Sequence, residues 1–400
     1  MSSRIETQFN VLQKHSGDVA RNQAINQIAT EFNYVAADTI IEELANDLNK
    51  DDSIRAVGVV DGQRRVKGVI ARSELFSLLG RPYGRDVLSR LPVTEVGMEA
   101  PRIRFDANIF TAADELDEYL RASEVSYFCL TDDGDRFHGI FSTHDLLLYL
   151  SEMTQRDIAL ARKLQSRIVH ERDLVVGKTF EFTSYSQSAK GVGGDFYRIA
   201  QTDDEDWVMT VCDVSGKGVS ASILTSVMWG MMSIYDFRRG MSPFIRQVNS
   251  YVMDTFESEK FVTGVFISYN ERTGVLQLCD MGHSHIFVFR NGKLQRLNTH
   301  NSNMPIGVVA DVDPVLNRFV PRENDILLVV TDGLLEQESE SQEIFSLERV
   351  SSILNAHHEK PVESINDRII SEFEAFRGNH HLNDDVTYIM VKFREQDVRL

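Results

Sequence analysis

Apolar runs of strand length alternate with amphipathic stretches of helix length in the C-terminal half of the chain. Neighbouring apolar runs are joined by tight turns such as NERTG and RNGK, which indicates antiparallel pairing. Because the helical stretches come in pairs between blocks of strands, we expect an α+β sandwich rather than a doubly wound parallel sheet. The pattern predicts a strand at 207–214, helices at 221–235 and 243–256, strands at 262–269, 275–281, 285–290 and 326–331, helices at 347–356 and 361–376, and a strand at 386–393.

An internal repeat occupies the N-terminal part of the chain. Segment 54–79, IRAVGVVDGQRRVKGVIARSELFSLL, aligns without a gap on segment 125–150, VSYFCLTDDGDRFHGIFSTHDLLLYL. Each copy has a strand, an Asp/Gly turn, a second strand and a helix, with a helical stretch upstream at 36–48 and at 112–120. Two such copies predict a pseudo-symmetric pair that shares one core.

Residues 144–175 connect the two parts and contain neither Gly nor Pro, which predicts one long helix. Two uses of its apolar stripe stay open: a coiled-coil seam between two copies of the chain, or packing against the chain's own domains. The expected division is an N-terminal domain at 1–142, a linker helix at 143–175 and a C-terminal domain at 176–400. The stripe has the three-and-four spacing of an amphipathic helix and consists of Leu147, Leu150, Met153, Ala161, Leu164 and Ile168.

Composition narrows the classes of function. A formal net charge of -18, with no block of clustered Lys and Arg, argues against nucleic acid and against anionic membranes as partners. The N-terminus has no basic start followed by an apolar stretch, and no segment reaches about 18 apolar residues, so we expect a cytoplasmic protein. Cys129, Cys212 and Cys279 are far apart and flanked by apolar residues, which favours buried thiols over a redox or zinc site.

Four aspartates stand where apolar runs end at a glycine or a polar turn: Asp195 in VGGDFY, Asp213 in CDVSGKG, Asp332 in VVTDGLLE and Asp384 in LNDDVT. For any one of them, a strand-end carboxylate that caps a turn is a sufficient explanation. Four in the same setting favour a shared site. Hard oxygen ligands of this kind hold Mg²⁺ or Mn²⁺, and a pair of such ions supports hydrolysis of phosphoesters.

These segments resemble the SpoIIE-like (RsbU-like) branch of the metal-dependent serine/threonine protein phosphatases, the PPM or type 2C family. The resemblance covers about residues 159–393, with Ser188, Arg198 and His170 as departures from the family's pattern. The matching segments are ALARKLQ at 159–165, SAKGVGGDFY at 188–197, DVSGKG at 213–218, MGH at 281–283, PIG at 305–307, TDG at 331–333 and DDVT at 384–387.

The resemblance implies a PPM-type αββα sandwich of two antiparallel sheets flanked by helix pairs, and two bound Mn²⁺ or Mg²⁺ ions. Asp213 would bridge the ions, the Val214 carbonyl, Asp332 and Asp384 would complete their shells, and Asp195 would take an inner or water-mediated place. Asp213, Asp332 and Asp384 would then be the catalytic carboxylates. Lys190 and Lys217 could meet phosphate charge and His283 could donate a proton, with ordinary turn or core roles as the alternative for each.

Residues 20–150 resemble a tandem pair of CBS (cystathionine beta-synthase) domains, a family whose members often bind adenine nucleotides. The family's G-h-x-[ST]-x-x-D signature is present in the second copy as GIFSTHD (139–145), which makes Ser142 and Asp145 the candidate nucleotide-binding residues. The first copy departs from it with Ala71 and Glu74. Ser142 and Asp145 also suit the cap and first turn of a helix, and the two roles are compatible.

Together the two resemblances imply a phosphoserine/phosphothreonine protein phosphatase regulated through a CBS pair. By resemblance its substrate would be a phosphorylated STAS-domain anti-sigma antagonist in bacterial partner switching, and the protein could form a homodimer through the CBS pair and linker helix. The alternative is a nucleotide-sensing scaffold whose phosphatase-fold domain acts by binding proteins. GGDF at 193–196 is similar to the GGDEF motif of diguanylate cyclases, but the glutamate is missing.

Overall fold

The computed structural model describes residues 8–16, 24–121, 126–257, 259–299 and 303–395. The chain divides into two compact units, Met1–Gln155 and Arg156–Leu400, and the boundary falls inside helix α5 (Thr143–Gln165). Val125, where the second copy of the repeat begins, lies outside the described residues. Within the described ranges, no helix combines the length and the apolar character needed to cross a membrane.

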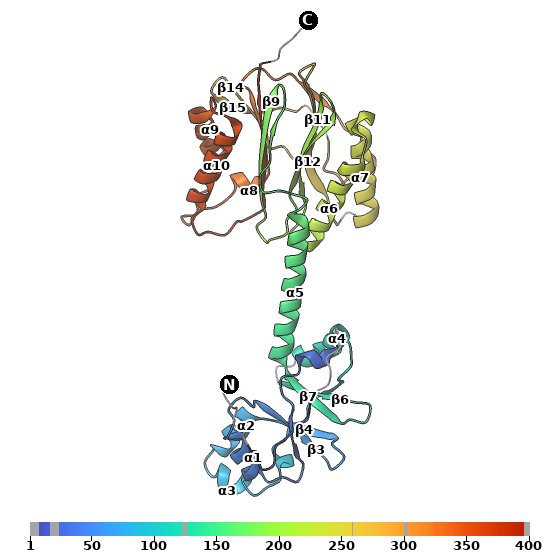
Figure 1. Cartoon of the computed structure of the whole chain (residues 1–400), viewed down its shortest axis with the longest axis vertical. Coiled ribbons are helices and arrows are strands. Elements are labelled where there is room, and N and C mark those ends of the chain that lie inside the picture. Colours follow the sequence, from blue (N-terminus) through green and yellow to red (C-terminus); the bar gives the residue numbers. More distant parts are fainter. Residues whose placement is uncertain (1–7, 17–23, 122–125, 258, 300–302, 396–400) are drawn as a thin grey trace, which may run out of the picture. The chain divides into compact units, whose positions relative to one another are not determined.

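The N-terminal unit has two small sheets, one from each copy of the repeat, and in each a parallel strand pair adjoins an antiparallel hairpin (Figure 1). The strands are β1 (Gln13–Lys14), β2 (Asn33–Ala36), β3 (Ala56–Val60) and β4 (Val66–Ala71) in one sheet, and β5 (Arg102–Arg104), β6 (Tyr127–Thr131) and β7 (Phe137–Ser142) in the other. The helices are η1 (Ile25–Ile28), α1 (Ile41–Leu48), α2 (Arg72–Leu79), α3 (Gly84–Leu88), η2 (Val93–Glu95) and α4 (Ile109–Arg121).

The predicted pseudo-symmetry of the repeat is confirmed. Val66 N donates to Asp135 O at 2.9 Å, and its counterpart Phe137 N donates to Arg64 O at 3.0 Å. Both hairpins carry a register irregularity at the equivalent place, between Val59 and Val60 in one copy and between Leu130 and Thr131 in the other. Both copies contribute to one apolar cluster, which contains Ala56, Val60, Val66, Val69, Ala100, Cys129, Phe137 and Ile140.

One helix prediction in this unit is wrong at its start. The sequence predicts a helix from residue 36, whereas α1 begins at Ile41. The preceding residues form β2, whose Ala36 pairs in parallel with Val60, and the Ala37 N–H donates to the Val60 carbonyl at 2.8 Å. Pairing with a strand that lies more than 20 residues further along the chain therefore outweighs the helical preference of this segment.

The C-terminal unit contains two antiparallel sheets. One runs in the order β10 (Phe196–Asp203), β11 (Asp206–Val214), β12 (Val262–Asn270), β13 (Val275–Met281), β16 (Asn317–Phe319). The other runs in the order β15 (Lys293–Arg296), β14 (Ile286–Arg290), β17 (Ile326–Val330), β18 (Val386–Phe393), β9 (Phe180–Gln187), β8 (Leu174–Val176). The helices are α6 (Val219–Ile234), η3 (Phe237–Arg239), α7 (Met241–Phe256), α8 (Asp332–Leu335), α9 (Ser346–His357) and α10 (Val362–Arg377).

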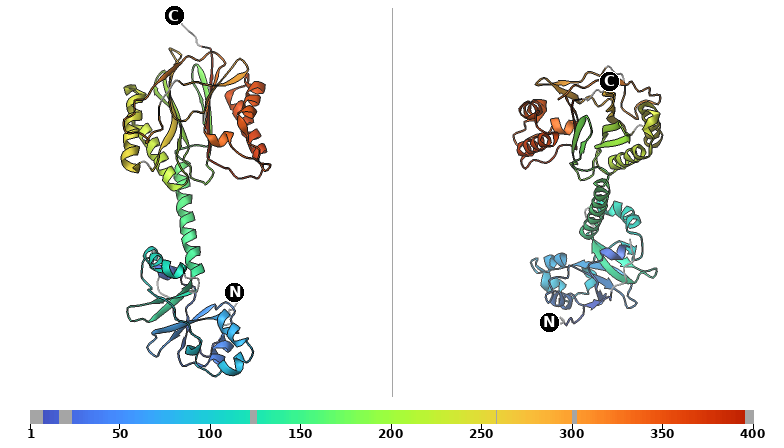
Figure 2. Two further views of the ribbon diagram at one scale, coloured as in Figure 1. Left: turned by 180° about the vertical axis from the view of Figure 1, so that it is seen from behind. Right: turned by 45° about the horizontal axis from the view of Figure 1, so that its top comes forward.

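Three apolar clusters hold this unit together. One lies between the two sheets, where Met209 and Ile267 of the first sheet pack in the same cluster as Leu327 and Val391 of the second. The other two join α6 and α7 to the five-stranded sheet and α9 and α10 to the six-stranded sheet. Figure 2 shows the two helix pairs on the outer faces of the two sheets. The predicted α+β sandwich of antiparallel sheets flanked by helix pairs is confirmed.

The helix predicted at 144–175 is too long, because α5 ends at Gln165. Leu174 instead pairs with Thr183 in an edge strand, and Ser186 N donates to Glu171 O at 2.8 Å. An uninterrupted run without Gly or Pro permits a helix but does not require one. Here the edge of the six-stranded sheet offers this segment backbone partners that the linear pattern does not reveal.

Candidate metal centre

The register of β10 and β11 brings two of the predicted aspartates to one end of the five-stranded sheet. Phe196 pairs with Cys212, so the residues just outside that pair, Asp195 and Asp213, are neighbours. Burial raises the pKa of Asp213 to about 7, with the nearby Asp332 carboxylate adding to the effect. Burial and the Asp213 charge also raise the pKa of Asp195 well above its usual range. Carboxylates that repel one another away from water are stabilised by a bound cation.

The other two predicted aspartates come from neighbouring strands of the six-stranded sheet. Asp332 follows β17 as the first residue of α8, and Asp384 lies just before β18. A Cβ atom on Gly333 would overlap the carbonyl oxygen of Asp385, so only glycine permits this approach between the two loops. Burial is the main cause of the raised pKa of Asp213, and the charges of Asp332, Asp384 and Asp385 add to it, so carboxylates from both sheets lie near one another.

Two threonine hydroxyl groups and a backbone ladder fix this end of the second sheet. Thr331 Oγ1 donates to Asp195 Oδ2 at 2.7 Å and accepts a hydrogen bond from Thr387 N at 2.9 Å. Thr331 N donates to Thr387 O at 2.8 Å, and Thr387 Oγ1 lies 2.9 Å from Ser186 Oγ. Because Thr331 is fully buried, its hydroxyl ties the Asp195 carboxylate of one sheet to the strand ends of the other.

Asp385 has a supporting role that the sequence did not reveal. Its Oδ1 accepts a hydrogen bond from Ala189 N at 2.8 Å, and its Oδ2 accepts one from Gly194 N at 2.7 Å. A Cβ atom on Gly193 would lie 2.6 Å from the same Oδ2. The carboxylate therefore holds the loop that leads into Asp195. The doubled aspartate in LNDDVT was a signal in the sequence, but the two roles could be separated only in the folded chain.

The remaining predicted ligand, the Val214 carbonyl, lies against the same loop, since a Cβ atom on Gly194 would lie 2.7 Å from Val214 O. Asp384 contacts a cationic side chain, with its Oδ2 2.7 Å from Lys217 Nζ. Lys217 Nζ also donates to the Asn383 carbonyl at 2.9 Å. In the part of the chain that the structure describes, no three His, Cys, Asp or Glu side chains form a ready cluster around one point.

The donor set nevertheless fits a hard divalent cation. It consists of carboxylate oxygens and a backbone carbonyl, without thiolates, and burial together with neighbouring carboxylates raises the pKa of Asp195 and Asp213. Asp195, Asp213, Val214, Asp332 and Asp384 remain the predicted ligand residues. The structure brings the segments that carry them to one region of the C-terminal unit.

His283 takes the core role rather than the role of a proton donor. It is 6% exposed, its Nε2 lies 2.7 Å from the Val330 carbonyl, and its Nδ1 lies 3.3 Å from Thr263 Oγ1. The carbonyl requires a proton on Nε2, which leaves Nδ1 to accept from the threonine hydroxyl. Burial lowers the pKa of His283 to about 4, so the ring is neutral at physiological pH. Lys190, the third candidate side chain, is exposed.

This burial predicts a pH dependence of stability. The pKa of His283 falls from 6.5 in the unfolded chain to about 4 in the folded one, so its contribution is present above pH 6.5 and is lost as the pH falls towards 4. The full shift corresponds to about 3 kcal/mol. We expect the free energy of unfolding of His283→Gln to depend less steeply on pH than that of the wild type across this window. The free energies of unfolding are measured with urea at several pH values from 4 to 7.5. If they change equally with pH in the variant and the wild type, the histidine does not carry this proton linkage.

The candidate ligand residues of the N-terminal unit lie together at the start of α5. Asp145 Oδ2 accepts hydrogen bonds from Ser142 N at 2.8 Å, from Ser142 Oγ at 2.6 Å and from Thr30 Oγ1 at 3.1 Å, and Asp145 N donates to Ser142 Oγ at 3.1 Å. The expected capping role is therefore confirmed. At the equivalent place in the first copy, Ala71 provides no side-chain cap for α2.

A cavity of about 510 Å³ adjoins this cap. Its lining includes Ser142 and Asp145 together with Glu31, Arg55 and Tyr127. Glu31 is 7% exposed, burial raises its pKa, and its Oε1 accepts a hydrogen bond from Arg55 N at 3.0 Å. The cavity thus combines acidic, basic, hydroxyl and aromatic groups, which suits an organic ligand with several polar groups.

Comparison with known proteins places the C-terminal unit in a family. The model of the family described as Stage II sporulation protein E (SpoIIE) matches residues 203–394. Phosphoserine phosphatase RsbP of Bacillus subtilis (strain 168) is 23% identical over 244 residues, which cover 60% of this chain and 58% of that protein. The chain thus spans less than two thirds of the length of this relative.

Two solved structures are similar at low identity. The SiaA-PP2C domain of Pseudomonas aeruginosa is 16% identical, with a TM-score of 0.49 and coverage of 62% of this chain and 98% of that one. A structure of the PP2C phosphatase domain with a fragment of the regulatory domain of SpoIIE from Bacillus subtilis is 17% identical, with a TM-score of 0.44 and coverage of 55% and 63%. The family match agrees with the motifs in the sequence and with the sandwich of two antiparallel sheets. The C-terminal unit of this chain is a SpoIIE-type domain of the PPM phosphatase family.

Proposed function

We propose that the protein is a Mn²⁺- or Mg²⁺-dependent phosphatase of phosphoserine and phosphothreonine in proteins. The observation that carries the proposal is the convergence of four segments on one region of the C-terminal unit. The register of β10 and β11 makes Asp195 and Asp213 neighbours, and the close approach of Gly333 to Asp385 joins the loops of Asp332 and Asp384. Burial raises the pKa of both Asp195 and Asp213, and perturbed carboxylates of this kind are typical of functional sites. The B. subtilis relative is named a phosphoserine phosphatase, which supports the same substrate chemistry.

In this proposal each residue has a distinct task. Asp213, the Val214 carbonyl, Asp332 and Asp384 would hold the ions, and Asp195 would support this ligand set directly or through water. When bound, the ions activate a water molecule and neutralise phosphate charge. Thr331 keeps the Asp195 carboxylate in place through its 2.7 Å hydrogen bond. In the proposed mechanism the chain itself provides no covalent nucleophile.

Hydrolysis of p-nitrophenyl phosphate by the full-length protein tests this proposal and separates it from the scaffold alternative. We expect phosphate release that depends on added Mn²⁺ or Mg²⁺ and stops with EDTA, and we expect phosphoserine peptides to be hydrolysed in the same conditions. A protein that binds partners but releases no phosphate at any metal concentration would act as a scaffold.

We further propose that the N-terminal unit regulates this activity as a CBS pair in a cytoplasmic protein. The pseudo-symmetric repeat, the 510 Å³ cavity and the position of Asp145 in that cavity support an adenine nucleotide as ligand. The regulatory change would pass through α5 to α6 and α7 and shift the population of a metal-competent state. Exposed leucines on α5, including Leu160 and Leu164, support a homodimer through this helix and the CBS pair.

The substrate proposed from the family resemblance is a phosphorylated STAS-domain anti-sigma antagonist in bacterial partner switching. Turnover of such a phosphoprotein should be measured with and without AMP, ADP, ATP and a dinucleotide. We expect at least one nucleotide to change the rate in the full chain and to lose this effect in Asp145→Ala. A rate that no nucleotide alters, and that is also unchanged by removal of residues 1–140, would exclude regulation by the N-terminal unit.

A further inference from the structure

The peptide groups of Gly193 and Gly194, directly before Asp195, have partners from four parts of the C-terminal unit. Gly193 N and O both bond to the side chain of Gln165, and Gly194 N bonds to Asp385 Oδ2. Gly194 O accepts hydrogen bonds from Thr225 Oγ1 at 2.9 Å and from Val214 N at 3.3 Å. Every backbone donor and acceptor of the two glycines is thus engaged, which leaves this loop little freedom to move.

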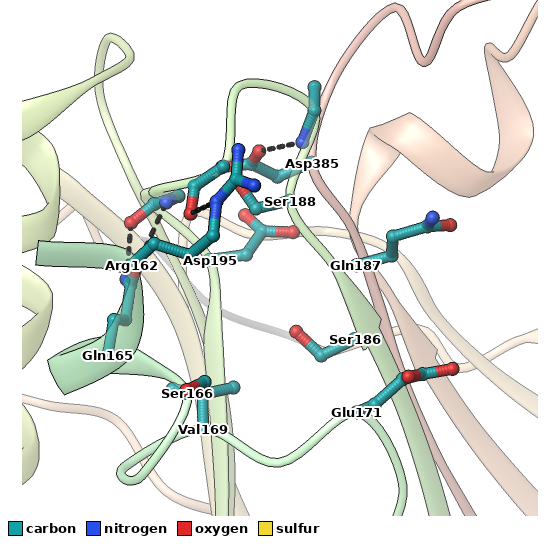
Figure 3. A pocket seen from close by; sticks show the side chains of 13 residues that line it. Arg162, Gln165, Ser166, Val169, Glu171, Ser186, Gln187, Ser188, Asp195 and Asp385 are labelled. Carbon is teal, nitrogen blue, oxygen red and sulfur yellow. Dashed lines mark hydrogen bonds between the residues drawn. The ribbon is translucent and has the colours of Figure 1, made fainter. Parts of the chain in front are cut away.

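Gln165 is the last residue of α5 and contributes two of these bonds. Its Nε2 donates to Gly193 O at 2.8 Å, and its Oε1 accepts from Gly193 N at 3.0 Å. The side chain is 9% exposed, so both bonds are shielded from water. Figure 3 shows the two bonds as dashed lines beside Arg162, which reaches the same loop one helical turn earlier. The side-chain amide of Gln165 thus bonds to both the N–H and the carbonyl of Gly193, as the backbone of a neighbouring strand would.

The position of this loop matters because several parts of the candidate metal centre lie against it. A Cβ atom on Gly193 would come within 2.6 Å of Asp385 Oδ2, and one on Gly194 within 2.7 Å of Val214 O. Asp195 follows directly in the chain. A displacement of the glycine backbone by a fraction of an ångström would therefore move Asp195 and press on Asp385 and on the loop after Asp213 together.

We propose that Gln165 is a positioning residue of the metal centre, which holds the Gly193–Gly194 backbone at the place where Asp195 and the Val214 carbonyl can bind cations together. The proposal rests on the proposed function, because it assigns Gln165 a task at the same site. Both hydrogen bonds of the Gln165 side chain go to Gly193 rather than to a predicted ligand atom, so it acts through the backbone of the loop.

Mn²⁺ binding to the full-length protein tests this role without relying on turnover. We expect Gln165→Met, which keeps the length of the side chain and loses both hydrogen bonds, to weaken Mn²⁺ affinity at least ten-fold in isothermal titration calorimetry. Arg162→Ala is the matched control. It removes the Arg162 Nε bond to Gly191 O, at 3.1 Å, from the same helix to the same loop, and it should leave the affinity within two-fold of the wild type.

Gln165→Glu provides a second and sharper variant. It retains an acceptor for Gly193 N but places a second carboxylate oxygen against the Gly193 carbonyl, which then keeps only the 3.5 Å hydrogen bond from Thr225 Oγ1. Charge alone would tighten cation binding, because a negative group is added near Asp195 and Asp385. If Gln165 acts by positioning the loop, Gln165→Glu should instead bind Mn²⁺ more weakly than the wild type does.

The melting temperature of each metal-free variant shows whether it is folded. Wild-type affinity in Gln165→Met, or tighter binding in Gln165→Glu, would overturn the positioning role. An equal loss of Mn²⁺ affinity in Arg162→Ala would also overturn it, because any loosening of the loop would then be enough to weaken metal binding. A wild-type protein that binds no Mn²⁺ would contradict the proposed function itself, which separates the two failures.

Discussion

Asp213→Asn is expected to reduce metal-dependent phosphatase activity by roughly a thousand-fold, about 4 kcal/mol of transition-state stabilisation. Burial raises the pKa of Asp213 to about 7, and the charges of Asp332, Asp384 and Asp385 add to the effect, so this carboxylate lies among those of the proposed site. The amide has almost the shape of the carboxylate but carries no charge, and it is a poor ligand for a bridged pair of hard cations. Hydrolysis of p-nitrophenyl phosphate at saturating Mn²⁺ measures the loss.

The matched control is Asp206→Asn at the opposite end of the same strand. Asp206 accepts a hydrogen bond from Asn270 Nδ2 at 2.7 Å on the exposed side of the sheet, and its loss should leave turnover within two-fold of the wild type. Asp213→Asn should also raise the melting temperature of the metal-free protein, because it removes a charge from a group of mutually repelling carboxylates. Turnover in Asp213→Asn close to that of the wild type would contradict the catalytic assignment.

Sequence patterning located the strands that carry the site because each is a buried apolar run with a turn signal at its end. The structure has β13 and β18 at the residues expected, 275–281 and 386–393. For the edge strand at Leu174–Val176, the sequence pattern instead predicts a continuation of the preceding helix. Its partner, β9, is antiparallel and close in the chain, but Leu174 and Val176 are both exposed, so no apolar alternation marked this segment as a strand.

The candidate ligands could be predicted for a related reason. Asp213 and Asp332 stand at the ends of interior strands of their sheets, and residues at such ends converge when two sheets pack face to face. The residues that support the ligands could not be predicted in this way. Asp385 and Gln165 act by bonding to the backbone of one loop, at Gly194 and Gly193, and that choice of partner depends on tertiary packing alone.

Gly333→Ala is expected to destabilise the C-terminal unit by about 3 kcal/mol, at the upper end of the cost of overpacking. The added methyl group would overlap the carbonyl oxygen of Asp385 and approach its carbonyl carbon to 2.9 Å. Both are backbone atoms next to β18, which is buried along its whole length, so they cannot rotate away as a side chain could. The overlap should be relieved only by separating the loop of Asp332 from the loop of Asp384.

That separation should affect catalysis as well as stability. A shift of about 1 Å between groups that must act together can cost roughly a hundred-fold in rate, so we expect kcat to fall by this order in Gly333→Ala. Gly230→Ala in α6 is the matched control. Its methyl group would meet nothing within 4 Å, and alanine in a helix should raise stability by about 0.5 to 1 kcal/mol without a change in kcat. Urea unfolding and turnover of both variants decide the matter: normal kcat in Gly333→Ala would mean that the two aspartate loops need not be this close for the reaction.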